Sequence, residues 1–160
     1  MKANIGIPEK NLQEEAKMLN TLLADETVLY IKTRNYHWNL ESHSFAEIHR
    51  FLEEQYTMLA GMIDELAERI RQLGHYAVAT LEDYLKLTNL TEGQAGETQE
   101  KALQILLDDH ETLIREIRKM AKQADEKYED AGTNDFLVGL MEKHEKMAWM
   151  LRSYLPNRKS

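Results

Sequence analysis

The feature that most constrains the fold is a long, nearly unbroken spacing of apolar residues at helical intervals. The chain of 160 residues contains only two prolines and seven glycines, so few positions interrupt a regular backbone. Apolar side chains recur every three or four residues, which is the period of one face of an α-helix. This spacing predicts helices over about 12–39, 44–73, 98–130 and 133–155. Four such helices predict an all-α fold.

Local signals mark the ends of these helices. Ser44 and Glu47 match the capping box, in which each side chain pairs with a free backbone N–H at a helix start. Gly74 and Gly132 are residues of the kind that follow a helix end. Thr80 begins a second capping pattern inside the long middle connection, which predicts a short extra helix there.

The lengths of the connections predict how the helices are arranged. The first and third connections are short and the middle one is long, which indicates a four-helix bundle of the ferritin-like type with one long crossover. The chain length suits one domain over residues 1–160. We expect residues 1–11 and 156–160 to form flexible tails.

Composition excludes several classes of function. The chain has no cysteine, which excludes disulfides, thiolate metal sites and cysteine nucleophiles. It has no apolar run near the ~18 residues that a membrane span needs and no signal-peptide pattern, so we expect a cytoplasmic protein with no membrane partner. The net charge of −8 disfavours a broadly basic surface for nucleic acid.

Four side chains of metal-ligating type share one face of the second predicted helix. At about 100° per residue, His49, Glu53, Asp64 and Glu68 fall within about 100° of one another around the axis. They cannot form one site on one helix, because Glu53 and Asp64 are roughly 16 Å apart along the axis. The helix therefore carries two half-sites, His49 with Glu53 and Asp64 with Glu68.

The positions of the half-sites predict how they meet. Both pairings, 49 with 68 and 53 with 64, have their midpoint just before Leu59. If the helix packs antiparallel on its own copy about a two-fold axis there, each histidine half-site faces the partner's carboxylate half-site. His37, near the end of the first helix, would complete each site. Two imidazoles with three carboxylates suit iron, manganese or zinc better than calcium or magnesium.

Three motifs taken together resemble the Dps family of starvation-induced mini-ferritins. They are the run Asn-Tyr-His-Trp-Asn at 35–39, the histidine at position 49, and the run Asp-Glu-Leu-Ala-Glu-Arg at 64–69. The resemblance covers nearly the whole chain. It implies a dodecameric shell with a ferroxidase centre at each dimer interface. It also implies oxidation of ferrous iron, preferably by hydrogen peroxide rather than oxygen, storage of ferric mineral, and protection against oxidative damage.

The resemblance also assigns roles to single residues. It implies that His37, His49 and Glu53 are metal ligands from one subunit, and that Asp64 and Glu68 come from its mate. The family usually has aspartate where this chain has Glu53, so the affinity for a second metal ion stays open.

Three further residues receive roles from the resemblance alone. Trp38 lies next to the predicted site and would quench oxidising equivalents. Asp130 and Asp135, around the start of the fourth helix, correspond to acidic pores at the three-fold axes of the shell.

Other functions compete with this interpretation. A di-iron site within one bundle carries Glu-x-x-His in its helices, and no histidine here has glutamate three residues before it. A DNA-compacting stress protein with weak or vestigial iron chemistry is the alternative. The basic residues at the chain ends are few, so we predict weak or absent DNA binding; they are Lys2, Lys10, Arg158 and Lys159. A purely structural bundle would leave the shared midpoint as a coincidence.

Overall fold

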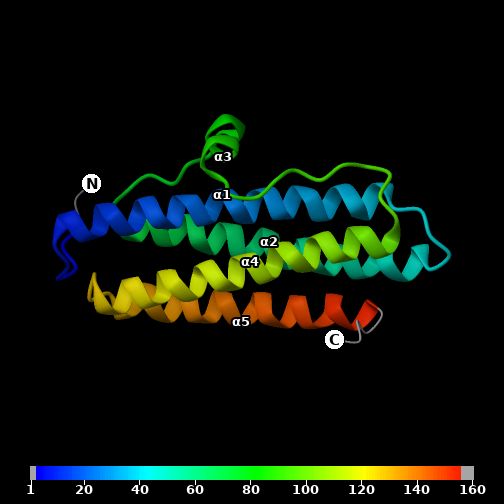
Figure 1. Ribbon diagram of the computed structural model, residues 1–160. Coiled ribbons are helices and arrows are strands. Elements are labelled where there is room, and N and C mark those ends of the chain that lie inside the picture. Colours follow the sequence, from blue (N-terminus) through cyan, green and yellow to red (C-terminus); the bar gives the residue numbers. More distant parts are fainter. Residues whose placement is uncertain (1–2, 156–160) are drawn as a thin grey trace.

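The computed structural model describes residues 3–155, and the regular elements of this part are all helices. Their bounds are α1 (Glu9–Asn39), α2 (Phe45–Gln72), α3 (Leu81–Leu87), α4 (Gln99–Glu126) and α5 (Ala131–Tyr154). Figure 1 shows α1 and α2 as one antiparallel pair and α4 and α5 as the other, with the crossover and α3 running along α1. The predicted four-helix bundle with a short helix in its long crossover is confirmed. Among residues 3–155, no helix has an apolar stretch long enough to cross a membrane.

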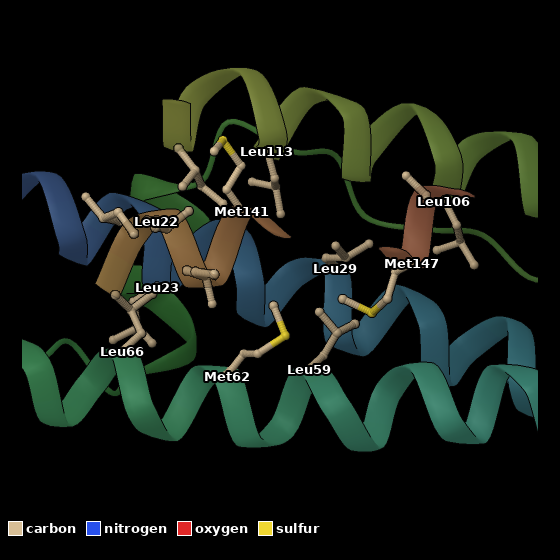
Figure 2. Packing of buried hydrophobic residues seen from close by; sticks show 14 of the residues in the cluster. Leu22, Leu23, Leu29, Leu59, Met62, Leu66, Leu106, Leu113, Met141 and Met147 are labelled. Carbon is tan, nitrogen blue, oxygen red and sulfur yellow. The ribbon is translucent and has the colours of Figure 1, made fainter. Parts of the chain in front are cut away.

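Apolar faces of the four long helices meet in a single core. Leu23, Leu59, Leu113 and Met147 come one from each long helix, and each is at most 1% exposed. Figure 2 shows these side chains pointing into the space between the helices. Because each buried side chain of this size contributes about 1.5–3 kcal/mol, the helices are held in a fixed mutual register.

This register brings the end of α1 beside the start of α2. The connection between the two helices covers only residues 40–44, so the helices must be antiparallel neighbours. The Tyr30 ring on α1 meets the Tyr56 ring on α2 edge to face, with centroids 6.1 Å apart. Nearer the connection, His37 in the last turn of α1 faces His49 in the second turn of α2, with ring centroids 3.7 Å apart.

The first helix begins earlier than the sequence predicts. It starts at Glu9, and backbone amides of its first turn donate to the carbonyl oxygen of Pro8 at 2.8 and 3.1 Å. The prediction that residues 9–11 belong to a flexible tail is wrong, because they are helical. The predicted tail at 156–160 lies outside the described residues.

The two predicted capping patterns have different outcomes. Thr80 caps α3 as predicted, because its hydroxyl oxygen accepts from a backbone amide of the first turn at 3.1 Å. The capping box at Ser44 is wrong, since the side chain of Ser44 makes no cap hydrogen bond. Its hydroxyl donates instead to the Gln99 side chain at 3.1 Å, and Glu47 accepts from the Tyr154 hydroxyl at 2.8 Å. Both side chains tie the start of α2 to the other helix pair.

Of the two glycines predicted to follow helix ends, Gly74 does so and Gly132 does not. Gly74 follows α2 with φ of 89°, a conformation that suits glycine. The predicted end at Gly132 is wrong, because α4 stops at Glu126 and Gly132 lies in the first turn of α5. The chain reverses at Glu129, whose φ is 56°, and Asp130 then caps α5.

Candidate metal centre

The predicted ligands occupy one turn of α1 and one face of α2. His37 lies in the last turn of α1 and is 6% exposed, whereas His49 is half-buried. Glu53, Asp64 and Glu68 on α2 are all exposed to solvent in the single chain. The two imidazoles are therefore fixed by the bundle, while the three carboxylates lie free on its surface.

The two histidines hold each other through reciprocal hydrogen bonds. Nδ1 of His37 lies 2.8 Å from the carbonyl oxygen of His49, and Nδ1 of His49 lies 2.8 Å from the carbonyl oxygen of His37. A carbonyl oxygen only accepts, so each Nδ1 must carry the proton. The rings stack with centroids 3.7 Å apart. In the neutral imidazoles both Nε2 atoms keep a lone pair, which is how a protein prepares histidine for a metal.

The structure brings together only part of the predicted ligand set. Glu53 follows His49 by one helical turn on the exposed face of α2. Asp64 and Glu68 lie farther along the same helix, and roughly 16 Å of helix separates Glu53 from Asp64. Among residues 3–155, no three His, Cys, Asp or Glu side chains are grouped so that they could hold a metal ion. One described chain thus offers two histidines with a carboxylate at one end of α2 and two carboxylates at the other.

Two aromatic rings pack against the histidine pair. The Tyr56 ring meets the His37 ring edge to face at 5.1 Å, and the Phe45 ring lies 5.0 Å from the His49 ring. Trp38 is 60% exposed, and the guanidinium of Arg34 lies over its indole at 4.6 Å. Apolar rings lower the polarity around the imidazoles and thereby strengthen charge interactions close to them.

The two predicted pore residues have different environments. Asp130 is 4% exposed, and its carboxylate accepts from the backbone and hydroxyl of Thr133 and from the Arg69 guanidinium, at 2.7 to 3.2 Å. Burial alone would raise its pKa, but these hydrogen bonds from Thr133 and the charge of Arg69 hold the pKa of Asp130 below its ordinary value. Asp130 is thus committed to the junction before α5. Asp135 is exposed.

A polar cluster lies inside the bundle, between α1, α4 and α5. His144 donates to or accepts from Glu26 through Nε2 at 2.6 Å, and its Nδ1 lies 2.9 Å from Nδ1 of His110. All three are at most 1% exposed. Burial, with a contribution from His144, holds the pKa of His110 well below its ordinary value. Sequence reasoning missed Glu26, although it falls on the apolar stripe of α1 between Leu22 and Leu29.

The chain is similar to known ferritin-like proteins over most of its length. The family model described as a ferritin-like domain matches residues 16–159. An uncharacterized low temperature-induced protein of Nostoc sp. is 41% identical over 95% of this chain and 86% of its own length. DNA protection during starvation protein 2 of Bacillus anthracis is 38% identical over 87% of this chain and 94% of its own length.

Solved structures give the same result. The crystal structure of the DPS protein from Vibrio cholerae O1 superposes with a TM-score of 0.92 at 35% identity and covers 98% of both chains. That protein is described as a member of a broad superfamily of ferritin-like diiron-carboxylate proteins. The X-ray structure of Dps from Thermosynechococcus elongatus has a TM-score of 0.88 at 32% identity, with 94% of this chain and 96% of that chain covered.

Proposed function

Because the chain belongs to the Dps family of ferritin-like proteins, we propose that it oxidises ferrous iron at a site shared by two subunits and stores the ferric product inside a cage. In this proposal His37, His49 and Glu53 of one subunit meet Asp64 and Glu68 of its mate. The cage is a homo-oligomer, with the twelve subunits that are typical of the family.

The observation that carries the proposal is the reciprocal hydrogen bonding of His37 and His49. Each Nδ1 donates to the other residue's backbone carbonyl at 2.8 Å, so each Nε2 is the atom left to bind a metal. A merely structural histidine pair would not need two identical tautomers held side by side. The mixed imidazole and carboxylate set suits iron, and zinc or manganese would be its substitutes.

The exposure of α2 supports a two-fold interface at this site. The shared midpoint of the two half-sites lies between Met58 and Leu59, and Met58 is 38% exposed. Nearby Ala60 and Gly61 are exposed, and a Cβ added to Gly61 would meet nothing within 4 Å. Small side chains at this point leave room for a second helix to approach closely. Two antiparallel copies of α2 would then form two equivalent sites per dimer.

The proposed chemistry needs two ferrous ions bound next to each other in one shared site. Two ferrous ions give one electron each to hydrogen peroxide, its O–O bond breaks, and two protons from solvent complete two water molecules. No hydroxyl radical is released when both electrons arrive at the same site. Oxygen would serve less well as the oxidant, and Glu53, longer than aspartate by one methylene group, would set the affinity for the second ion.

Entry of iron and binding of DNA are separate parts of the proposal. Asp135 is exposed near the start of α5 and would attract cations at a pore, whereas the carboxylate of Asp130 is already engaged. Relatives of this chain are named for protecting DNA. Of the four basic residues near the chain ends, Lys10 is exposed in the first turn of α1, and the other three lie outside the described residues. With a net charge of −8 we propose weak or no DNA binding.

Mixed cages test the sharing of the site. His49→Ala and Asp64→Ala each remove one half-site, so each variant alone should be inactive. Co-expressed in equal amounts, half of the interfaces are mixed and each mixed interface has one intact site. Ferrous oxidation should therefore return to about a quarter of the wild-type rate.

A matched pair of variants provides the control. His49→Ala and Glu53→Ala damage the same half-site, so their mixed interfaces hold no intact site and no activity should return. Mass spectrometry of intact cages would verify the mixing in both cases. Equal recovery in the two mixtures, or none in either, would show that the site is not shared between subunits.

A further inference from the structure

A path of aromatic rings leads from the histidine pair into the protein. The Tyr56 ring packs against the His37 ring with centroids 5.1 Å apart and planes at 77°. Tyr56 in turn meets Tyr30 at 6.1 Å and 81°. An electron can therefore pass from a phenol ring to the imidazole beside it through direct contact. Among residues 3–155, the rings packed on His37 belong to His49 and Tyr56, and Trp38 is not one of them.

Electrostatics also disfavour Trp38 as the donor. An indole that loses an electron keeps its N–H at first and so becomes a cation. The Arg34 guanidinium carbon lies 4.6 Å from the Trp38 ring, and two positive charges at this distance repel each other. Trp38 is the residue that the family resemblance favours, whereas its contacts in this chain oppose its oxidation.

A tyrosine avoids this repulsion because it loses its hydroxyl proton together with the electron and stays neutral. Arg34 lies 5.3 Å from the Tyr56 ring and 5.4 Å from the Tyr30 ring, so the two tyrosines experience a similar charge. They differ at the hydroxyl, since that of Tyr30 accepts a hydrogen bond from Arg34 at 2.7 Å. A hydrogen bond from a cation stabilises the reduced phenol. Tyr56 is therefore both closer to His37 and easier to oxidise.

We propose that Tyr56 supplies the second electron when a site holds only one ferrous ion. The proposal rests on the ferroxidase function proposed above. One ferrous ion and Tyr56 each give one electron to hydrogen peroxide, and the O–O bond breaks. The phenol proton and one proton from solvent complete two water molecules, which leaves ferric iron and a neutral tyrosyl radical. Tyr56 would thereby prevent a lone ferrous ion from releasing a hydroxyl radical.

The test uses assembled cages loaded without oxygen with less than one ferrous ion per proposed site. Hydrogen peroxide is added, ferric absorbance is followed, and samples are freeze-quenched for electron paramagnetic resonance. Wild-type protein should form a radical whose spectrum narrows when the protein contains ring-deuterated tyrosine. Tyr56→Phe keeps the packing of the ring and should lose this signal while ferric iron still forms.

Three control variants make the result specific. Trp38→Phe, Tyr30→Phe and Tyr84→Phe should keep the deuterium-sensitive radical; Tyr84 lies on α3, outside the path of rings. Survival of the signal in Tyr56→Phe, its loss in Trp38→Phe, or ferric iron without any radical would overturn the assignment of Tyr56. If wild-type cages form no ferric iron at all, the ferroxidase proposal itself fails, and the role of Tyr56 falls with it.

Discussion

Glu15 is a buried carboxylate whose ionisation should make the protein less stable as the pH rises. It lies on α1 with 0% of its surface exposed, and neither carboxylate oxygen has a hydrogen-bond partner among residues 3–155. Burial first, and then the nearby Asp130 carboxylate, raises the pKa of Glu15 to about 7, against an opposing effect of Arg69. We therefore expect Glu15→Gln, which has the same shape and cannot ionise, to remove a pH-dependent loss of stability.

The size of the effect follows from the two pKa values of Glu15. In the unfolded chain its pKa returns to its ordinary value of 4.5, so between the two values the folded protein holds a proton that the unfolded chain has released. The contribution of Glu15 to stability is therefore fully present below the unfolded pKa, and it is lost as the pH rises through about 7. From about pH 5 to about pH 8, linkage predicts a loss of roughly 2.5 kcal/mol in the free energy of unfolding.

The assay is urea unfolding of metal-free wild-type protein and Glu15→Gln at matched concentration across this pH range. The difference in free energy of unfolding between the two should shift by about 2.5 kcal/mol in favour of the variant as the pH rises. Glu14→Gln is the control on the same helix, because the hydrogen bond and charge of Lys17 lower the pKa of Glu14. Its difference from wild type should be flat over the same range. A flat difference for Glu15→Gln as well would refute the assignment of a raised pKa.

Two further predictions concern the buried polar cluster and DNA. His144→Leu should cost about 3–5 kcal/mol because it leaves the buried Glu26 carboxylate without a partner, whereas the double change of Glu26 and His144 to Leu should cost clearly less. Urea titrations of His144→Leu, Glu26→Leu and the double variant would check this, and strict additivity of the two single changes would contradict it. Wild-type cages should give no gel shift with linear DNA at physiological salt and neutral pH, so a tight complex that resists salt would contradict the prediction of weak binding.

The four-helix bundle could be predicted from the sequence because the apolar spacing that produces it is repeated along each helix. Leu19, Leu52, Leu106 and Leu140 lie on stripes that any helical spacing detects, and all are at most 2% exposed. The junction before α5 was not predictable in this way. Its reversal depends on Glu129, a residue in the left-handed region without the usual glycine. No local pattern distinguishes this glutamate from the exposed ones around it.

The site was predictable only as a set of residue types. The spacing on α2 predicted which residues to consider, but not that His37 and His49 would each donate to the other's backbone. That arrangement depends on the shape of the 40–44 turn, which brings the end of α1 and the start of α2 within hydrogen-bonding distance of each other. Glu15 and Glu26 escaped notice for a related reason. Both fall on the apolar stripe of α1, but their burial is produced by side chains of other helices, which the spacing along α1 does not describe.

The separation between fixed imidazoles and exposed carboxylates has a consequence for how metal binding acts on the protein. Since the core and the histidine pair are complete in one chain, we expect the fold to form without metal, unlike small domains that are unfolded without it. Glu53, Asp64 and Glu68 keep their hydration in the single chain because they are exposed. If the carboxylates of one copy bind metal held by the histidines of another, the free energy of binding stabilises the contact between copies. Iron should therefore strengthen the proposed dimer interface far more than it stabilises the fold of each subunit.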